Sequence, residues 1–518
     1  MIYGKNYING KFVDAKQALH PQKVFSKVNP SNEENIGFYP DTDRASVNEA
    51  VACARKAQKE WKKLSRVKRA EYFDNLIGAI RGWQNIIIDK ICLDTGKTYN
   101  EAFAELNESL HMAQYTFAQA REPYGKFVAS EIAEKDITQF RKPKGVVAVI
   151  APWNFPLAIG GFWTSAPALL EGNTVVFKPS EDAPFTGEII SRLYHEAGFP
   201  EGVFNVVHGS GYTGDYLLNA DVDHICFTGS VAVGQHIRRH VADTFHKSCS
   251  CEMGSKSAVI VFDDALSDMS INACIASAFK LSGQRCVSSG RLLIHKNIYD
   301  AFCEKFVEAA KKVKTGNVFL GLSQPAINGG ADPYDHSVFY GPLINASQFE
   351  RVKKFNALTD TEGVQILLEG KRLDQKGYYL TPHVYKCDWK WAHNEDESGN
   401  ITHPFLRQEV FGPHVALIPF DDADDAVRIY NDTDYGLSMA VCTNNASIAR
   451  YMRDNCDYGL GYHNLPSVGA ESHINFGGVK ASGYGGSSAA GTFHAVTHEV
   501  TWTANFDQSG FKMAQGLK

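Results

Sequence analysis

The 518-residue sequence predicts an α/β fold with two parallel-sheet regions and a small extended β segment. Predicted strands and helices alternate from residue 146 to about residue 253, and a second alternating region begins near residue 254. Between the N-terminal helices and the first region, residues 122–144 are predicted to be extended and to leave the main body. Such alternation is typical of parallel sheets, which bind ligands at the C-terminal ends of their strands.

Composition limits the possible classes of protein. Hydrophobic residues at 44% and charged residues at 21% are typical of a globular chain, and the length suggests roughly two to four domains. The net charge of −6 shows no excess of basic residues of the kind that is typical of nucleic-acid-binding proteins. We therefore expect no nucleic-acid partner. The eleven cysteines show no C-x-x-C pair, which predicts free thiols in a reducing compartment and no metal site. Without a secretory signal in the first residues, we expect a cytoplasmic protein.

Residues 145–170 carry no charge and are long enough to span a bilayer. Three prolines interrupt them, however, and Asn154 lies in the middle. We therefore predict a buried strand, a turn and a buried helix, and no membrane association. Cys249 and Cys251, two residues apart, are expected on alternate faces of a strand.

Local patterns define the remaining elements. Asn9-Gly10 predicts a hairpin within residues 6–13, and Thr42 or Asp43 can cap a first helix. Helices are expected at 43–64, 67–82, 84–94, 98–120, 186–196, 267–281, 298–313, 346–357, 422–431 and 446–455, of which the first four are predicted to form a shell without chemistry. Strands are expected at 146–151, 174–177, 203–207, 225–227, 258–262, 291–295, 365–368, 415–419, 438–442 and 495–505. Residues 320–340 and 386–404 are expected to be long surface loops.

Cys286 is the candidate nucleophile. It follows the turn-forming pair Ser282-Gly283, after a predicted helix and before a predicted strand, so that a thiol can reach a cleft from a rigid support. The alternative is an inert packing thiol, since cysteine is among the most buried residue types.

Two further polar residues could assist such a thiol. Asn154 lies between Pro152 and Pro156, and its amide could donate to an oxyanion; alternatively it caps the following helix. Glu252 ends an apolar strand beside Gly254, which suits a general base that activates water; alternatively it forms a structural salt bridge.

Three segments carry residues that suit a nucleotide. Gly229-Ser230 joins a strand to a helix, where backbone N–H groups can meet phosphate, although no G-x-G-x-x-G fingerprint is present. Lys178 and Glu181 could hold ribose hydroxyls, or they could belong to a solvated loop. Glu409 and Phe411, at alternate positions, could take a ribose and a flat ring.

Together these segments resemble the aldehyde dehydrogenase superfamily, specifically its non-phosphorylating NAD(P)-dependent members. The similarity runs from about residue 25 to residue 505, and the motifs occur in the family's order. They are PWNFP at 152–156, FKPSE at 177–181, FTGS at 227–230, EMGSK at 252–256, GQRC at 283–286, EVFGP at 409–413 and FGGVKASG at 476–483.

The resemblance implies two Rossmann-like domains and an arm. Residues 1–121 and 145–253 would bind the cofactor, residues 254–465 would form the catalytic domain, and residues 122–144 and 484–505 would form a β oligomerisation arm of a homodimer or homotetramer. Cys286 would attack the aldehyde, Asn154 and the Cys286 N–H would hold the oxyanion, and Glu252 would activate water against the thioester. The implied cofactor-binding residues are Trp153, Lys178, Ser180, Glu181, Gly229, Ser230, Gly254, Glu409 and Phe411.

The sequence gives fewer signals for the substrate and for the choice between NAD and NADP. Residues 469–472 are similar to members that oxidise carboxylated semialdehydes, and Arg285 could anchor a distal carboxylate, with Phe155, Phe162 and Phe476 lining the channel. The alternative is a plain aliphatic aldehyde, with Arg285 in a structural ion pair. Glu181 would repel a 2′-phosphate and favours NAD, although Lys178 and Ser180 could tolerate NADP.

Two other functions are alternatives to this one. A CoA-acylating relative usually lacks a base at the position of Glu252, and a non-catalytic relative would lack Cys286, Glu252 or Asn154. The chain departs from the family pattern at Ser255, where a second glycine is common, and at GYGGSSAAG after the last motif. None of these departures removes a catalytic residue.

Overall fold

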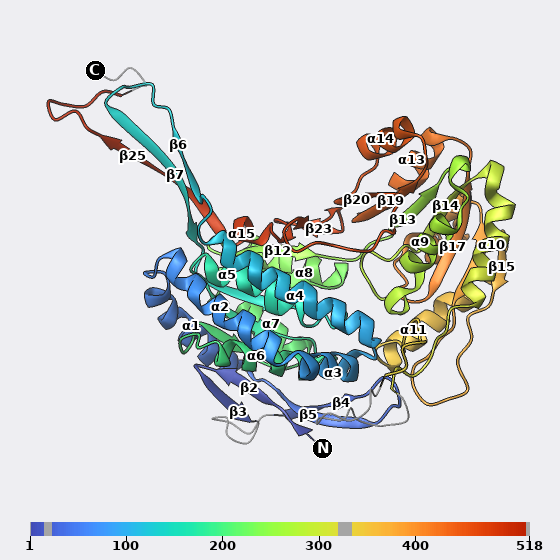
Figure 1. Ribbon diagram of the computed structural model, residues 1–518, viewed down its shortest axis with the longest axis horizontal. Coiled ribbons are helices and arrows are strands. Elements are labelled where there is room, and N and C mark those ends of the chain that lie inside the picture. The colour runs from blue at the N-terminus through green and yellow to red at the C-terminus, as the bar shows by residue number, and fades with distance from the viewer. Residues whose placement is uncertain (1, 15–22, 320–333, 514–518) are drawn as a thin grey trace.

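The computed structural model describes residues 2–14, 23–319 and 334–513. Two α/β bodies lie side by side, and a narrow β arm projects from the first (Figure 1). Most of the predicted loop at 320–340, residues 320–333, lies outside the described residues. The predicted fold class is confirmed.

The first body is built on an eight-stranded sheet in the order β23-β12-β11-β8-β9-β10-β2-β3. Its strands are β2 (Lys5–Ile8), β3 (Lys11–Asp14), β8 (Val146–Ile150), β9 (Thr174–Lys178), β10 (Phe204–Val206), β11 (His224–Thr228), β12 (Ser248–Glu252) and β23 (Gly483–Tyr484). The five strands from β12 to β10 are parallel, whereas β2, β3 and β23 add antiparallel edges. The C-terminal ends of β8, β11 and β12 therefore meet at one edge of the sheet.

Helices cover both faces of this sheet. They are α1 (Arg44–Trp61), α2 (Arg66–Gly82), α3 (Gln84–Thr95), α4 (Tyr99–Gln119), α5 (Ser165–Leu170), α6 (Pro184–Glu196), α7 (Gly211–Asn219) and α8 (Val231–Ala242). Apolar residues of α1, α7 and α8 share one core cluster, and those of α2 to α6 share the other. The side chains of Asp43, Ser65 and Thr98 cap α1, α2 and α4, which places these helices within a few residues of the predicted ranges.

Two local expectations concern the ends of this sheet. The hairpin β2–β3 turns through Asn9 and Gly10, which both have positive φ, as the sequence predicts. Cys249 and Cys251, by contrast, lie in the same core cluster, so the expectation of alternate faces is wrong. Residues two apart in a strand point to the same face.

The uncharged segment 145–170 is a buried strand, a turn and a buried helical segment, as predicted. Its helical part begins with a π-helix, Ala158–Thr164, and continues into α5. Tyr194 supports this turn by donating its hydroxyl hydrogen to the carbonyl of Gly161 at 2.6 Å. Among the described residues, no helix is long and apolar enough to cross a membrane.

The second body contains a seven-stranded sheet in the order β15-β16-β17-β14-β13-β19-β20. Its strands are β13 (Ala258–Val261), β14 (Arg291–His295), β15 (Val364–Leu368), β16 (His383–Cys387), β17 (His414–Phe420), β19 (Ser438–Cys442) and β20 (Leu460–His463). Only the β15–β16 pair is antiparallel within this sheet as described. The sequence analysis missed β16 and β20, which are short and partly polar.

Helices again cover both faces of the second sheet. They are α9 (Asp268–Phe279), α10 (Tyr299–Lys311), α11 (Ala346–Ala357), α13 (Ala423–Asn431) and α14 (Ala446–Asn455). The helices α9 and α10 share one core cluster, and α11, α13 and α14 share the other. The predicted loop 386–404 is exposed over most of 393–402, but Trp389 at its start is buried and donates its indole N–H to Asp432.

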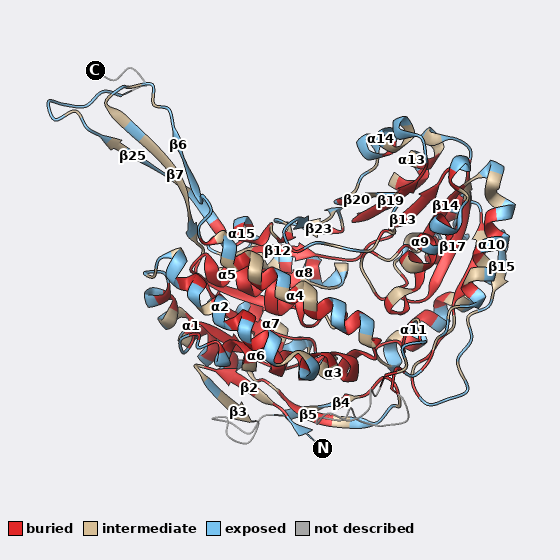
Figure 2. Ribbon diagram, in the orientation of Figure 1, coloured by how far each residue is buried: buried red, intermediate tan, exposed pale blue. Residues whose placement is uncertain are grey.

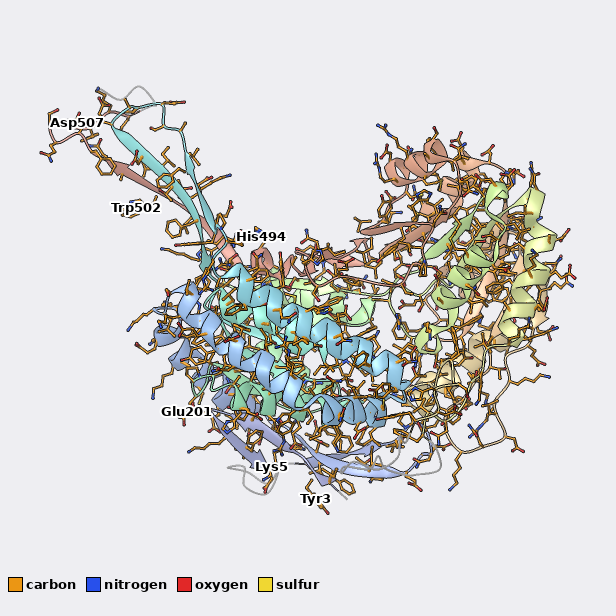
Figure 3. All side chains as sticks on the ribbon, in the orientation of Figure 1. Tyr3, Lys5, Glu201, His494, Trp502 and Asp507 are labelled. Carbon is orange, nitrogen blue, oxygen red and sulfur yellow. The ribbon has the colours of Figure 1, made fainter. Side chains whose placement is uncertain are left out.

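The arm is a three-stranded antiparallel sheet of β6 (Gly125–Val128), β7 (Lys135–Pro143) and β25 (Thr497–Asn505). The pairing of β25 with β7 runs without interruption from Thr497↔Pro143 to Asn505↔Lys135. Much of the arm is exposed (Figure 2), and Trp502 and Asp507 mark its outer part (Figure 3). The start of the predicted segment 484–505 lies elsewhere, because β23 pairs with β12 in the first sheet.

Phe162, which belongs to the π-helix, is predicted to contribute strongly to the stability of the fold. Phe162 is fully buried in the core of the first body, whereas Phe245 is fully exposed. Phe162→Ala should lower the free energy of unfolding by about 3–5 kcal/mol, since the surrounding core cannot close the cavity completely. Urea denaturation followed by circular dichroism measures this loss, with Phe245→Ala as the control. Equal midpoints for the two variants would contradict the burial of Phe162.

Candidate active site

Cys286 lies where two cavities meet. The larger cavity has a volume of about 770 Å³ and extends along α4, and the smaller has a volume of about 330 Å³ and reaches the strand ends of the first sheet. Cys286 and Ile159 line both. A group attached to this sulfur can therefore meet ligands from two directions.

The loop that carries Cys286 connects α9 to β14, as the sequence predicts. The residues before it form a tight turn in which Leu281, Ser282 and Gly283 have φ of 55°, 56° and 69°. Burial raises the pKa of the Cys286 thiol to about 12, and the negative charges of Glu409 and Glu252 add to this rise. The thiol is therefore neutral at pH 7 and needs a proton acceptor before it can act as a nucleophile.

Asn154 follows β8 and lines the smaller cavity beside Cys286. Its Nδ2 donates to the carbonyl of Gln284 at 3.0 Å, and its Oδ1 has no hydrogen-bond partner among the described residues. The following turn is held by Glu105, whose Oε1 accepts from the N–H groups of Leu157 and Ala158 at 2.8 and 3.1 Å. The alternative role of Asn154 as a helix cap is not seen, since its side chain bonds to the Cys286 loop.

The carboxylate that fixes this turn belongs to a buried ion pair. Lys97 donates to Glu105 Oε2, and both side chains are almost fully buried. The Lys97 ammonium also lies 4.2 Å from the centre of the Phe155 ring. An ion pair in the interior requires such additional contacts to offset the loss of hydration.

Glu252 ends β12 and is buried, but it lines neither cavity among the described residues. It lies against Gly477, where an added Cβ would come within 2.9 Å of Glu252 Oε1. Neither carboxylate oxygen has a hydrogen-bond partner of normal geometry among the described residues. Burial holds the pKa of Glu252 well above its ordinary value, and the backbone N–H groups of Gly478 and Ser488 offset this only in part.

The smaller cavity has the features of a dinucleotide site. Ser230 caps α8 and, with Gly229, presents the N-terminus of this helix to the cavity. Gly254 allows close approach of Glu409, because an added Cβ would lie 2.4 Å from its Oε2. Glu409 accepts from the N–H of Ser255 at 2.8 Å, and burial raises its pKa to about 7.

Aromatic residues complete this wall. Trp153 and Phe411 form an edge-to-face pair with ring centres 5.5 Å apart, and both line the smaller cavity. The residues present therefore fit a nucleotide with a flat ring near Cys286 and phosphates near α8.

Lys178, Ser180 and Glu181 lie beyond the described wall of the smaller cavity, at the end of β9. The buried Lys178 Nζ donates to the carbonyl of Pro179 at 3.1 Å and lies 3.4 Å from Glu181 Oε2. Glu181 is half-exposed, with 46% of its side chain accessible. Because β9 is adjacent to β8, these residues share the edge of the sheet that carries Trp153 and Asn154.

Ser255, the departure from the family pattern, contacts the nucleophile loop. Its hydroxyl donates to the carbonyl of Cys286 and lies 2.9 Å from the hydroxyl of Ser257. The serine thus links the segment that follows β12 to the backbone of Cys286.

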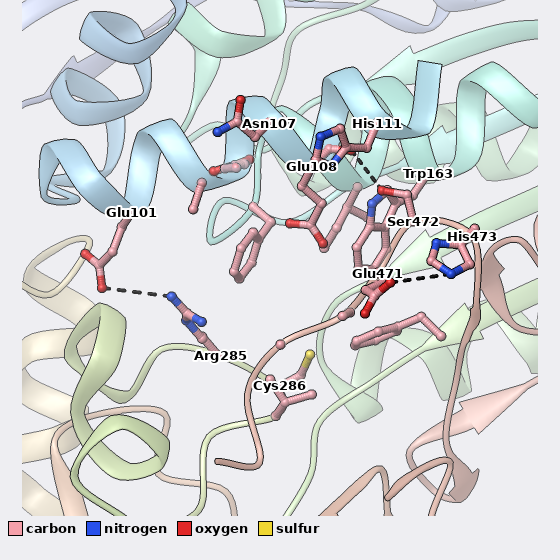
Figure 4. A pocket seen from close by; sticks show the side chains of 18 of the residues that line it. Glu101, Asn107, Glu108, His111, Trp163, Arg285, Cys286, Glu471, Ser472 and His473 are labelled. Carbon is pink, nitrogen blue, oxygen red and sulfur yellow. Dashed lines mark hydrogen bonds and ion pairs between the residues drawn. The ribbon is translucent and has the colours of Figure 1, made fainter. Parts of the chain in front are cut away.

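The larger cavity contains three of the four predicted substrate residues. Phe155, Arg285 and Phe476 line it, but Phe162 does not; Trp163 takes that place (Figure 4). The ring of Phe162 instead packs against Tyr194 in the core. The π-helix explains the difference, since its wider turn changes which residues share a face.

The sequence does not predict the acidic face that α4 presents to the larger cavity. The residues of α4 that line this cavity include Glu101, Glu105, Glu108 and His111, although the first four helices are expected to form only a shell. The signal was the spacing of Glu101, Glu105 and Glu108, which places three carboxylates on one helix face. Glu471, Ser472 and His473 also line the cavity, and the hydroxyl of Ser472 donates to the carbonyl of Glu108 on α4 at 2.9 Å.

Arg285 and Glu108 are the central charged groups of this cavity. The guanidinium Nη2 of Arg285 lies 3.9 Å from Glu101 Oε1, and its Nε is buried without a partner among the described residues. Burial raises the pKa of Glu108 to about 8, and the nearby charge of Glu105 contributes in the same direction. Arg285 and Lys97 oppose this shift without cancelling it.

Comparison with known proteins agrees with the predicted resemblance. A family model described as "Aldehyde dehydrogenase family" matches residues 17–502. The chain is 33% identical over 496 residues to a protein of Oryza sativa subsp. japonica named "Succinate-semialdehyde dehydrogenase, mitochondrial", covering 94% of this chain and 86% of that protein.

Solved structures show the same similarity. Lactaldehyde dehydrogenase from Escherichia coli superimposes with a TM-score of 0.87 at 30% identity, over 97% of this chain and 99% of that chain. Betaine aldehyde dehydrogenase from Staphylococcus aureus, solved in complex with NAD+, has a TM-score of 0.87 at 26% identity, over 99% of this chain and 97% of that chain. The chain therefore belongs to the aldehyde dehydrogenase family of NAD(P)-dependent oxidoreductases.

Proposed function

We propose that this protein oxidises an aldehyde to a carboxylic acid with NAD, through a thioester on Cys286. The observation that carries the proposal is the position of Cys286 between the two cavities. The larger cavity can bring a carbonyl carbon to the sulfur from one side. The smaller cavity can bring a hydride acceptor from the other.

In the first step, the Cys286 thiolate attacks the carbonyl carbon to give a thiohemiacetal. The raised pKa of the thiol means that a base must take its proton. Glu252 is the candidate, because its negative charge contributes to the raised pKa of Cys286, and because burial raises its own pKa, which makes its carboxylate a stronger base. Its side chain must turn from Gly477 toward the sulfur to act.

The oxyanion that forms would be held by Asn154 and by the backbone N–H of Cys286. The Asn154 amide has two N–H groups, and one of them donates to the carbonyl of Gln284. The other is free to meet the oxyanion. Removing one such donor typically reduces transition-state stabilisation by ~3–4 kcal/mol.

NAD, when bound, would accept the hydride that leaves the tetrahedral carbon. Glu409, Phe411 and Trp153 would orient its ribose and ring, Gly229, Ser230 and Gly254 would leave room for its phosphates, and Lys178, Ser180 and Glu181 would hold the other ribose. Glu252 would release its first proton to solvent, take a second proton from water as the water attacks the thioester, and return that proton to the sulfur when the C–S bond breaks. The products are the acid and the free thiol.

A cysteine substitution tests this chemistry. Cys286→Ala should abolish NADH formation from a panel of aldehydes, followed at 340 nm, since Cys286 is the only thiol among the described residues that line either cavity. Cys53→Ala, which removes a partly buried thiol on α1, should retain wild-type activity. Glu252→Gln should reduce both the first release of NADH and steady-state turnover, because Glu252 takes the proton of the thiol as well as that of the hydrolytic water. Equal rates for Cys286→Ala and the wild type would contradict the proposal, and a requirement for CoA would favour acyl-CoA formation.

For the substrate, we propose a carboxylated semialdehyde anchored by Arg285. The guanidinium lies in the wall of the larger cavity next to the nucleophile, and 3.9 Å is too long for a hydrogen bond to Glu101. Its donors are therefore available to a carboxylate. The similarity to a protein named for succinate semialdehyde supports this choice.

The carboxylates of the same wall favour a second candidate, an aldehyde that carries a cationic group. Glu108 and Glu471 face the larger cavity and could pair with an ammonium (Figure 4). With a pKa of about 8, Glu108 is mostly protonated at pH 7 and could instead donate to a carboxylate. The charge of the substrate thus decides which protonation state of Glu108 binds it.

Removing Arg285 tests the carboxylated substrate. Arg285→Gln should raise KM for succinate- or glutarate-type semialdehydes about 10- to 100-fold, since a hydrogen bond to a charged group contributes ~1.5–3 kcal/mol. KM for propanal should change little. Arg192→Gln, which removes a surface arginine paired with Glu188, is the control. An unchanged KM for every semialdehyde would rule out this anchor.

The pH dependence of KM separates the two candidates. As the pH rises through about 8, Glu108 loses its proton and becomes negative. KM for a carboxylated aldehyde should then increase, and KM for an amino aldehyde should decrease. In Glu108→Gln this dependence should disappear from both. Initial rates between pH 6.5 and 9.5 would measure it, and a profile that persists in Glu108→Gln would assign the titration to another group.

We also propose that the arm mediates assembly into a homodimer or homotetramer. Phe127 and Trp502 on the arm are 82% and 66% exposed, which is unusual for large apolar side chains in a monomer.

The cytoplasmic location remains a prediction from the cysteine pattern, and the relative from rice is named as mitochondrial.

A further inference from the structure

The turn before Cys286 has an unfavourable backbone conformation. Leu281 and Ser282 both lie in the left-handed region, with ψ of 36° and 28°, and Gly283 continues it. Residues with a side chain rarely adopt this conformation, and they keep it only where surrounding contacts determine it. At Gly283 a side chain is excluded, because a Cβ would lie 2.2 Å from the carbonyl of Gly412.

On one side, the turn is held by residues of the second body. The hydroxyl of Ser282 donates to the carbonyl of Gly341 at 2.8 Å. The side chain of Gln284 accepts from the N–H of Ile344 at 3.0 Å and donates to the carbonyl of Leu281 at 3.3 Å. These contacts fix the later part of the turn.

On the other side, the turn is held by Glu101 of α4. Its Oε1 accepts from the N–H of Leu281 at 2.7 Å, across the boundary between the two bodies. Its Oε2 accepts from the N–H and hydroxyl of Thr98 at 3.2 and 3.0 Å, which completes the capping box of α4. The carboxylate is buried, so both oxygens have fixed partners.

The turn is linked directly to both Asn154 and Cys286. The carbonyl of Gln284 receives the amide of Asn154, and the next residue but one is Cys286. A shift of the turn would therefore move the nucleophile and its oxyanion donor together. Displacements of about 1 Å at a reacting centre can reduce the rate ~100-fold.

We propose that Glu101 is a positioning residue for Cys286, which it holds in place through the left-handed turn at Leu281–Gly283. This role rests on the proposed function of Cys286 as the nucleophile. Glu101 contacts the turn with one oxygen and its own helix cap with the other. It thereby connects the loop, which belongs to the second body, to the rigid helix α4 of the first.

The test compares two variants that remove different halves of this contact. Glu101→Ala removes both the bond to Leu281 and the cap, whereas Thr98→Ala removes only the cap. We expect Glu101→Ala to lower kcat by ~10- to 100-fold with KM for the aldehyde within ~3-fold of the wild type. Thr98→Ala should remain near the wild-type kcat. Glu101→Gln, which keeps an acceptor oxygen, should recover most of the loss.

A second measurement does not depend on activity. The rate of alkylation of Cys286 by iodoacetamide, followed by peptide mass spectrometry without substrate or cofactor, should rise at least ~3-fold in Glu101→Ala, because the released loop exposes the thiol. The fully buried Cys274 serves as an internal control and should stay unmodified.

Three results would overturn the proposal. They are an unchanged kcat and alkylation rate in Glu101→Ala, an equal loss in Thr98→Ala, or an effect confined to KM, which would make Glu101 a substrate ligand. If the alkylation rate changes but the wild type oxidises no aldehyde, the positioning role stands and the proposed function fails.

Discussion

Two buried carboxylates on α4, four residues apart, fix the segments that carry Asn154 and Cys286 relative to one another. Glu105 receives the N–H groups that start the π-helix after Asn154, and Glu101 receives the N–H of Leu281 before Cys286. Residues at this spacing lie on the same face of a helix. Asn154 and Cys286, the proposed oxyanion donor and nucleophile, come from different bodies, yet both are placed against one rigid element. Burial of both carboxylates is energetically costly unless each keeps its full set of hydrogen-bond and ion-pair partners.

The electrostatics of the site oppose ionisation. Cys286, Glu252 and Glu409 lie in one buried region, and burial raises the pKa of each. The negative charges of both carboxylates further raise the pKa of the thiol. These groups therefore titrate as a set, in which the ionisation of one disfavours the next. A proton that leaves the thiol has neighbours able to accept it within the same environment, without passing first to bulk water.

Much of the fold and part of the site could be predicted from the sequence. Helix caps such as Asp43, the hydrophobic periodicity of the helices and the glycines at strand ends are local signals, and they placed Asn154, Gly229 and Cys286 at the ends of the correct elements. Glu252 was placed at the end of its strand, but its orientation toward Gly477 depends on residues distant in the sequence.

What could not be predicted depends on packing between distant segments. Trp163 rather than Phe162 faces the larger cavity because of a π-helix, which has no clear sequence pattern. The acidic stripe of α4 was visible in the sequence, but nothing local indicated that it faces a cavity rather than solvent. The strands β16 and β20 were missed because their short sequences do not alternate clearly, and their position in the sheet depends on β17 and β19.

The pairing of β25 with β7 has a consequence for the synthesis of the chain. About 360 residues separate the two strands, so at ordinary rates of translation β7 emerges from the ribosome roughly 20–70 s before its partner. During that interval β7 has only β6 beside it, and its other edge presents unpaired N–H and C=O groups. Such an edge can recruit the same strand of a neighbouring nascent chain. The arm is thus a segment where polysome crowding, chaperone binding and the timing of release decide whether chains close correctly or join one another prematurely.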